Sequence, residues 1–250
     1  MFSLLYYIFT LLQLTFFFVL SLLALIVLFP FDKPRRVVHE LSRAICMTWW
    51  YTPFTWRRKI TGLEHIDKKQ PYVIVINHNS MVDILSLYFL PLNFRWVSKR
   101  EVFRMPYIGQ LLLIHGDIAI DRGRGADSMR RVVEDGKLWV SRGVSIAMFP
   151  EGTRSKDGEI HRFKQGAFAL AKEAGVPILP VVMNGTTEIL KPSKLFDWKH
   201  YLQVSVLEPI SAEDVATKSV AELAEISHAA MTEQLAKLRQ EKAQYQEKSK

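Results

Sequence analysis

The first 31 residues constrain this chain most, because none of them carries a charged side chain. They are mainly Leu, Phe, Ile and Val, and the run exceeds the roughly 20 apolar residues that a helix needs to span a bilayer. A cleaved signal peptide would show a basic segment before a shorter apolar run and small residues after it, and this stretch shows neither. A buried core helix rarely runs this long without a charge. We therefore predict an N-terminal helical segment embedded in a membrane.

Basic and aromatic residues follow the apolar run. Residues 1–59 hold seven Lys or Arg and two Asp or Glu, a net charge of +5, out of +8 for the whole chain. Tryptophan and tyrosine gather in the same stretch, up to Trp56. Basic residues beyond an apolar span favour the cytoplasmic side, and such aromatic residues favour the lipid headgroup layer. We expect membrane lipids as partners, a following domain that faces the cytoplasm, and no nucleic acid, which would call for basic charge on the globular part.

Three prolines, Pro30, Pro34 and Pro53, interrupt any continuous helix through this region. Two arrangements therefore stay open. Residues 1–31 could cross the bilayer, or they could form a shallow helical hairpin with residues 49–56. Either arrangement predicts an integral or monotopic membrane protein, which in a bacterium would lie at the cytoplasmic membrane.

Four apolar runs farther along the chain each end in polar residues. The runs span residues 71–76, 118–120, 144–149 and 177–182, and helical patterns lie between them at about 126–141 and 166–173. Alternating strand and helix signals predict an α/β fold with a mostly parallel sheet flanked by helices. In such sheets ligands bind outside the carboxyl ends of the strands, so the polar clusters would meet at one crevice.

The first polar cluster contains His78 and Asp83, five positions apart, where the run at 71–76 leads into a predicted helix. Histidine is the side chain best placed to take a proton from a hydroxyl near neutral pH, and a carboxylate on its other ring nitrogen fixes the tautomer. The pair therefore suggests chemistry on an alcohol. Ser80 followed by Asp83 also fits a helix N-cap with an acid in the first turn, so this motif by itself leaves both interpretations open.

Further motifs make the signal more specific when they are taken together with the first. The four blocks, in chain order, are Asn77-His78 with Asp83; Lys99 to Phe103 with Pro106, Gly109 and residues 120–122; Phe149 to Ser155; and Val176 to Val181. Between residues 62 and 185 the chain thus resembles the glycerolipid acyltransferase family, and most closely its 1-acyl-sn-glycerol-3-phosphate acyltransferase (lysophosphatidate acyltransferase) branch. The resemblance implies a glycerol-3-phosphate acyltransferase-like fold.

The resemblance also implies roles for the first block. His78 would deprotonate the free glycerol hydroxyl while Asp83 holds its imidazole, and the oxygen would attack an acyl thioester directly, with no acyl-enzyme. The chain agrees in what it lacks, because it has no Gly-x-Ser-x-Gly nucleophile motif. Its single cysteine, Cys46, lies outside the four blocks, and we interpret it as a small apolar filler.

A phosphate on the acceptor calls for cations and backbone donors near the base. The resemblance associates Arg122, Glu151, Gly152 and Arg154 with the glycerol phosphate, and Lys99 is a weaker candidate. Gly152 would let the backbone approach the ligand closely. Structural roles stay open at this point, since Arg122 and Lys99 could be solvated surface charges and Glu151 could pair with Arg154.

The resemblance as a whole implies an enzyme of phospholipid biosynthesis. It would transfer a fatty acyl chain from acyl-CoA or acyl carrier protein to the sn-2 hydroxyl of lysophosphatidate, giving phosphatidate. We expect no cofactor beyond the acyl donor, and no metal site, because the other histidines share no ligand spacing. Acylation of a different lyso-lipid, hydrolysis of the thioester, and lipid binding without turnover are the alternatives that the same residues leave open.

We expect three parts along the chain. Residues 1–58 would form the membrane anchor with its aromatic and basic interfacial segment, residues 59–214 the acyltransferase catalytic domain, and residues 215–250 a C-terminal helical tail. The apolar residues of the tail recur at a loosely helical spacing. We therefore expect the tail to pack on the domain and to fray near Gln240.

Overall fold

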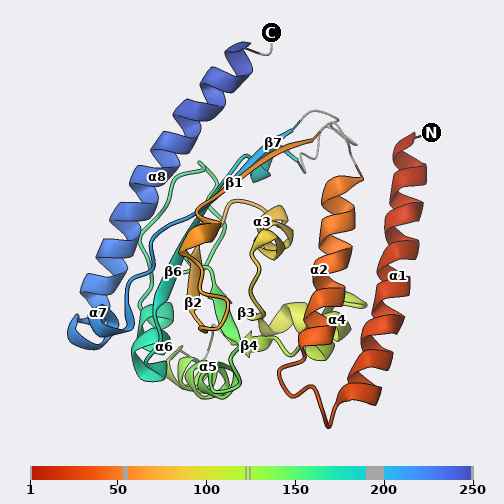
Figure 1. The fold of residues 1–250 in the computed structure, drawn as a ribbon, viewed down its shortest axis with the longest axis horizontal. Helices are drawn as coiled ribbons and strands as arrows, with labels where there is room; N and C mark the ends of the chain where they lie inside the picture. Colours follow the sequence, from red (N-terminus) through yellow and green to blue (C-terminus); the bar gives the residue numbers. More distant parts are fainter. Residues whose placement is uncertain (1, 53–55, 122, 124, 190–199, 249–250) are drawn as a thin grey trace.

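The computed structural model describes residues 2–52, 56–121, 123, 125–189 and 200–248. Its centre is a seven-stranded sheet in the order β1-β7-β6-β2-β5-β3-β4, with helices on both faces (Figure 1). Neighbouring strands are parallel except β6 and β7, which are antiparallel. The predicted α/β fold with a mostly parallel, helix-flanked sheet is therefore confirmed. The strands are β1 (Arg57–Thr61), β2 (Val73–Ile76), β3 (Phe94–Lys99), β4 (Ile118–Ile120), β5 (Ser145–Met148), β6 (Ile178–Asn184) and β7 (Tyr201–Val206).

The middle of the sheet is buried on both faces. Side chains alternate between the faces of a strand, so Val73 and Val75 of β2 join one apolar cluster while Ile74 and Ile76 join the other. Strands covered on both faces consist almost wholly of apolar residues, which is why β2, β5 and β6 coincide with runs that the sequence predicted.

Different helices cover the two faces. The helices α5, α6 and α8 pack on the face that carries Val73, through side chains that include Trp139, Phe168 and Leu235. The helices α2 and α3 pack on the opposite face, where Trp50 and Val82 are buried. The helices are α1 (Phe2–Leu28), α2 (Arg36–Tyr51), α3 (Val82–Ser86), α4 (Ile108–His115), α5 (Gly125–Val140), α6 (Gly166–Ala174), α7 (Ala212–Thr217) and α8 (Val220–Lys248), with short 3₁₀ helices η1 (Leu63–His65), η2 (Leu87–Phe89), η3 (Arg100–Arg104) and η5 (Thr186–Glu188).

The N-terminal residues form a helical hairpin on one flank of the molecule. Helix α1 runs beside α2 (Figure 1), and the side chain of Gln13 hydrogen-bonds that of Thr48 across the pair. Residues Ile8–Leu28, 21 residues with a mean hydropathy of 2.7, form the one described helix that is long and apolar enough to cross a membrane. Only 6% of its most apolar stretch is buried, so many of its apolar side chains, Leu12 and Ile26 among them, stay exposed although the helix packs on α2.

Helix α8 corrects the expectation that the tail frays near Gln240. The helix continues to Lys248, and its last turns are held by ion pairs to three separate parts of the domain. Arg239 contacts Glu159 at 2.7 Å, Glu241 contacts Lys59 at 2.8 Å, and Lys242 contacts Glu188 at 2.6 Å. Apolar spacing carries no information about such polar contacts, which is why the sequence placed the end of the helix too early.

Candidate active site

The end of β2 is fastened to β6 by Asn77, whose side chain is fully buried. Its Nδ2 donates to the carbonyl oxygen of Met183 over 3.0 Å, and its Oδ1 accepts from the Met183 N–H over 2.8 Å. The chain therefore leaves β2 at a fixed point on the carboxyl edge of the sheet. The residues that follow Asn77, from His78 to Asp83 in the first turn of α3, form the candidate catalytic segment, called the catalytic loop below.

The catalytic loop brings His78 and Asp83 together as the sequence predicted. His78 Nδ1 lies 3.0 Å from Asp83 Oδ2, and the same oxygen accepts the N–H groups of Asn79 and Ser80 over 2.6 and 2.7 Å. The Asp83 side chain is fully buried, whereas that of His78 is 14% exposed. Because a carboxylate can only accept, Nδ1 carries the hydrogen and Nε2 is left as the basic nitrogen. Among the described residues, none hydrogen-bonds to Nε2.

An aromatic stack holds the imidazole ring in place. The ring of Phe149, at the end of β5, lies on the His78 ring with centroids 3.8 Å apart and an angle of 15° between the planes. Trp96 of β3 stacks on the other side of Phe149 with centroids 5.1 Å apart. The stack leaves the His78 ring little freedom to turn and shields one of its faces from water. No sequence pattern indicated that Phe149 and Trp96 would hold the His78 ring.

The side chain of Glu151 holds the catalytic loop by accepting backbone N–H groups. It is 5% exposed, its Oε1 accepts the N–H of His78 over 2.9 Å, and its Oε2 accepts the N–H of His161 over 3.1 Å. Burial raises the pKa of this carboxyl, while the two N–H donors oppose the rise. The alternative pairing of Glu151 with Arg154 is absent from the described residues, since both carboxylate oxygens are directed at backbone donors.

The turn after β5 is also hydrogen-bonded to His78. Gly152 has a φ of +74°, a conformation that glycine adopts without strain, and its N–H donates to Phe149 over 3.0 Å. The N–H of Ser155 donates to the carbonyl oxygen of His78 over 2.7 Å. The block from Phe149 to Ser155 and the catalytic loop therefore form one hydrogen-bonded unit.

Two of the cations proposed for phosphate binding, Arg154 and Lys99, lie at or after the carboxyl ends of strands on the same edge of the sheet. Arg154 is exposed, and no described residue pairs with its guanidinium. Lys99 is also exposed, at the last position of β3, in register with Ile120 of β4. Arg122 lies outside the described residues. Lys164 is a further cation beside this turn, and the sequence pattern did not indicate it. Its Nζ would lie only 2.7 Å from a Cβ added to Gly152.

An apolar cavity of about 280 Å³ lies beside the catalytic loop, between the helical hairpin and α4. Ile84 and Leu85, which follow Asp83 in the chain, line it together with Trp96 of the aromatic stack. Cys46 also lines it, and burial raises the pKa of this thiol well above its ordinary range, so the group remains a neutral filler. A long apolar chain could therefore lie within reach of His78.

The described residues contain no group of three or more His, Cys, Asp or Glu side chains that could hold a metal ion. The residues gathered around His78 instead provide a base, two buried acids and exposed cations, which is a set suited to acid–base chemistry on a phosphorylated substrate.

A family model described as Acyltransferase matches residues 57–184, which include His78, Asp83, Glu151 and the cations proposed for phosphate binding. This chain belongs to the acyltransferase family. The match confirms the family resemblance, and it begins at β1 and ends at the last residue of β6.

Several curated proteins of the acyltransferase family are similar to this chain. One is 1-acyl-sn-glycerol-3-phosphate acyltransferase BAT2 of Brassica napus, 35% identical over 64% of this chain and 46% of its own length. The alpha form of Mus musculus is 35% identical over 70% of this chain and 63% of its own length, and the human beta form is 30% identical over 78% and 71%. The chain thus spans about half to two thirds of the length of the first two of these proteins.

Among solved structures, the crystal structure of the 1-acyl-sn-glycerophosphate acyltransferase PlsC of Thermotoga maritima is similar in fold. It matches with a TM-score of 0.67 over 91% of this chain and 95% of its own, at 23% sequence identity. At this sequence identity the likeness shows the shared fold alone, so the substrate has to be inferred from the chemistry of the site.

Proposed function

We propose that this acyltransferase moves a fatty acyl chain from a thioester donor, acyl-CoA or acyl carrier protein, to the sn-2 hydroxyl of 1-acyl-sn-glycerol-3-phosphate. The product is phosphatidate, a precursor in phospholipid synthesis. The observation that carries the proposal is the 3.0 Å contact between His78 Nδ1 and Asp83, which leaves Nε2 as the free base beside an apolar cavity and exposed cations. The names of the similar proteins support the choice of acceptor.

In the proposed mechanism, His78 Nε2 takes the proton of the sn-2 hydroxyl as its oxygen attacks the carbonyl carbon of the thioester. Asp83 stabilises the imidazolium that forms. The tetrahedral adduct then collapses, the carbon–sulfur bond breaks, and the imidazolium returns its proton to the departing thiolate. No acyl-enzyme and no cofactor beyond the donor are required.

Exposed cations on the edge next to His78 would hold the acceptor phosphate. Arg154 is the strongest candidate, because its guanidinium is exposed and has no partner among the described residues. No existing ion pair has to break before it binds a phosphate. Lys99 and Arg122 remain proposals from the family resemblance. Glu151 and Gly152 would act by shaping the turn that carries Arg154, since the carboxylate of Glu151 already holds two backbone groups.

Helix α1 would attach the enzyme to the membrane that contains its lipid substrates, with the catalytic domain on the cytoplasmic side. Exposed apolar side chains support this placement. They occur along α1, as at Leu12 and Ile26, and on the neighbouring segment before and within α4, as at Met105 and Leu113. The acceptor could then reach His78 from the lipid layer.

A panel of acceptors tests the proposal directly. The chain in detergent micelles, supplied with palmitoyl-CoA or palmitoyl carrier protein, should form diacyl product from lysophosphatidate and much less from monoacylglycerol, which has the same hydroxyl without the phosphate. Equal rates on the two acceptors would contradict phosphate recognition. Free fatty acid released at the same rate with no acceptor would identify a thioesterase instead.

A matched pair of variants tests the phosphate site. Arg154→Gln should raise the KM for lysophosphatidate about tenfold, the effect of losing one charge-assisted hydrogen bond, and leave the KM for the donor unchanged. The control is Lys69→Gln, which removes an exposed cation from the turn before β2, at the opposite edge of the sheet. An equal rise in both KM values for Arg154→Gln would argue against its contact with phosphate.

A further inference from the structure

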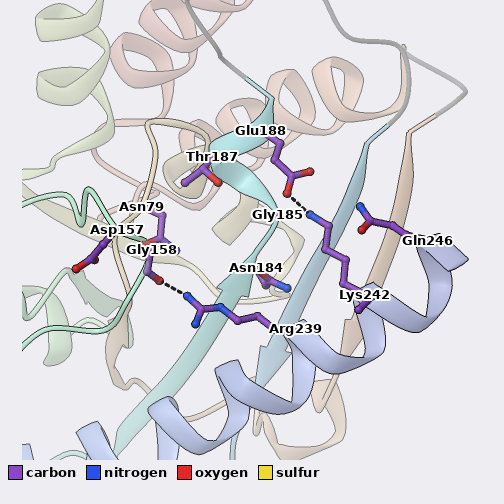
Figure 2. A pocket seen from close by; sticks show the side chains of 11 residues that line it. Asn79, Asp157, Gly158, Asn184, Gly185, Thr187, Glu188, Arg239, Lys242 and Gln246 are labelled. Carbon is purple, nitrogen blue, oxygen red and sulfur yellow. Dashed lines mark hydrogen bonds and ion pairs between the residues drawn. The ribbon is translucent and has the colours of Figure 1, made fainter.

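A second cavity, of about 310 Å³, opens on the α8 side of the catalytic loop (Figure 2). Its walls come from four segments: the catalytic loop at Asn79, the loop after β5, the end of β6 with η5, and the last turns of α8. This volume lies near the lower end of the roughly 300–1,000 Å³ that small-molecule sites occupy. None of the roles proposed above uses this cavity.

The two cations in the wall of this cavity are already paired. Arg239 donates to Glu159 Oε1 over 2.7 Å. It also donates to the carbonyl oxygen of Gly158 over 2.8 Å, and Lys242 contacts Glu188 over 2.6 Å (Figure 2). The carboxylates of Glu159 and Glu188 would repel a phosphate and compete with it for the two cations. The second cavity is therefore a poor site for the phosphate of the acceptor, in contrast to the exposed Arg154.

The wall also contains the carboxylate of Asp157, whose Oδ1 accepts the Ser155 hydroxyl over 2.8 Å and lies 3.1 Å from His161 Nε2. The lining groups that have no partner among the described residues are neutral: the hydroxyl of Thr187 and the side-chain amide of Gln246, both on exposed residues. Amide and hydroxyl groups complement a ligand that carries amides and hydroxyls of its own. The lining thus favours a polar, uncharged ligand.

The residues that directly follow His78 and Asp83 in the chain line two different cavities. Asn79 follows His78 and lines the polar cavity, while Ile84 follows Asp83 and lines the apolar one. The segment that carries the catalytic pair therefore borders the polar cavity near its start and the apolar cavity just after its end. An acyl thioester is divided in the same way at its reacting carbon–sulfur bond. The carbonyl side carries an apolar fatty chain, and the sulfur side carries pantetheine, a neutral arm of amides and a hydroxyl.

We propose that the cavity between α8 and the end of β6 binds the pantetheine arm of the acyl donor, the portion that CoA and acyl carrier protein share. This inference rests on the proposed function. It places the thioester at His78 with the fatty chain toward α1 and α2 and the arm toward α8. It also gives a role to the end of α8, which contributes Ala243 and Gln246 to the wall.

A substitution that fills the cavity tests this assignment. Ala243 is exposed on α8 and lines the cavity, so Ala243→Phe should obstruct the arm without disturbing the core. We expect kcat/KM to fall about tenfold for palmitoyl-CoA, palmitoyl carrier protein and palmitoyl-pantetheine alike. For palmitoyl-N-acetylcysteamine, a thioester that lacks most of the arm, we expect the same kcat/KM as in wild type. Ala236→Phe, at an exposed position of α8 outside the cavity, is the matched control and should change nothing.

Several outcomes would overturn the assignment. An equal loss on the truncated thioester would mean general damage, a loss confined to palmitoyl-CoA would mean that the cavity recognises the nucleotide, and a rise in the KM for lysophosphatidate would make it an acceptor site. Thr187→Val, which removes one hydroxyl and adds no bulk, should lower kcat/KM on the same three donors about threefold. Phosphatidate formation by wild type in the same assay separates the two claims: its absence rejects the proposed function, whereas its presence with an insensitive Ala243→Phe rejects only the cavity assignment.

Discussion

Asp83 combines two roles that the sequence left as alternatives. One carboxylate oxygen accepts the His78 imidazole and also the N–H groups of Asn79 and Ser80 at the start of α3. The backbone contacts of Asp83 fit an acid in the first turn of α3, although the N-cap residue is Met81 and no side chain caps it. The contact with His78 fits the acid–base interpretation, which stays a prediction. A carboxylate held by two backbone donors cannot swing away from the histidine, so the same contacts orient the imidazole.

We predict that Asp83→Asn lowers kcat by roughly a hundredfold to ten-thousandfold, the usual scale of general-base catalysis, because an amide does not stabilise the imidazolium. The KM values for both substrates should change little. Initial rates over a range of donor and acceptor concentrations measure this, with Asp67→Asn, at an exposed acid, as the control. A kcat close to that of wild type would show that the pair has only a structural role.

Gly152 allows a test that separates backbone strain from function. Gly152→Ala places a side chain at a φ of +74°, which should cost about 1–2 kcal/mol of unfolding free energy and disturb the turn that leads to Arg154. Gly143→Ala is matched, because Gly143 has a φ of +72° and open space around an added Cβ. Thermal unfolding should show a loss for Gly152→Ala at least as large as that for Gly143→Ala, because the Cβ added at Gly152 must also displace the side chain of Lys164. Only Gly152→Ala should lose activity. Equal activity in both would separate Gly152 from the site.

At the scale of elements, the sequence predicts best those strands whose environment is uniform. Strands β2, β5 and β6 are apolar runs because helices cover both of their faces. Strands β1, β3 and β7 escaped prediction because they carry charged or amide side chains that find partners far along the chain. In β3, for example, Arg95 is fully buried, stacks on Trp139 and donates to the carbonyl oxygen of Pro34.

The same distinction applies to the site. His78 and Asp83 lie five positions apart and turn toward each other within one loop, so their spacing suggested the contact and the four-block family resemblance made it specific. The partners of Glu151 are backbone groups of His78 and His161, and no residue pattern reports which backbone groups lie nearby. The aromatic stack likewise depends on the neighbouring positions of β3 and β5 in the sheet, which the sequence does not state.

A buried polar cluster locks α2 and α4 to the sheet. His39 of α2 contacts His115 of α4 over 3.0 Å, and His115 contacts Asp117 over 2.7 Å. Asp117 in turn accepts the Trp96 N–H over 2.8 Å, and Arg95 lies 3.3 Å from His115. These contacts fix the helices that line the apolar cavity.

The cluster predicts how stability depends on pH. Burial lowers the pKa of His39 and of His115, and Arg95 lowers both further while Asp117 opposes the shift for His115. A histidine whose pKa is lower in the folded state binds more protons when unfolded, so its contribution to stability is lost as the pH falls below its ordinary pKa of about 6.5. The loss is at most about 1.4 kcal/mol per pH unit for each histidine.

The unfolding free energy, measured by denaturant titration between about pH 7.5 and 5, should therefore fall with decreasing pH. His39→Gln removes one titrating group and should flatten this dependence. His228→Gln, at a partly exposed ring that bonds the carbonyl oxygen of Ile160, is the control and should preserve it. The same pH dependence in His39→Gln as in wild type would exclude the cluster as its source.

For the whole molecule, the proposed role of the helical hairpin is to connect the catalytic site to the membrane. Deleting residues 1–31 should release the protein from anionic vesicles, because it removes the exposed apolar surface of α1. It should also slow turnover of long-chain donors, since Leu14 and Phe17 of α1 line the apolar cavity. Vesicle sedimentation and donor kinetics measure the two effects.

A double substitution separates the two effects of that deletion. Leu12→Asn with Ile26→Asn changes exposed positions of α1 that do not line the apolar cavity. We expect this variant to bind vesicles less tightly and to keep its kcat in detergent. Unaltered vesicle binding in both the deletion and the double variant would contradict attachment through α1.

The most direct test of the central claim compares wild type with His78→Ala in one membrane preparation, with and without lysophosphatidate, while the lipid product is identified. We predict that phosphatidate forms only when the acceptor is present, and that His78→Ala lowers its rate by roughly a hundredfold or more. Phosphatidate formed by His78→Ala at the wild-type rate would contradict the account, because no other described residue occupies the position of the base.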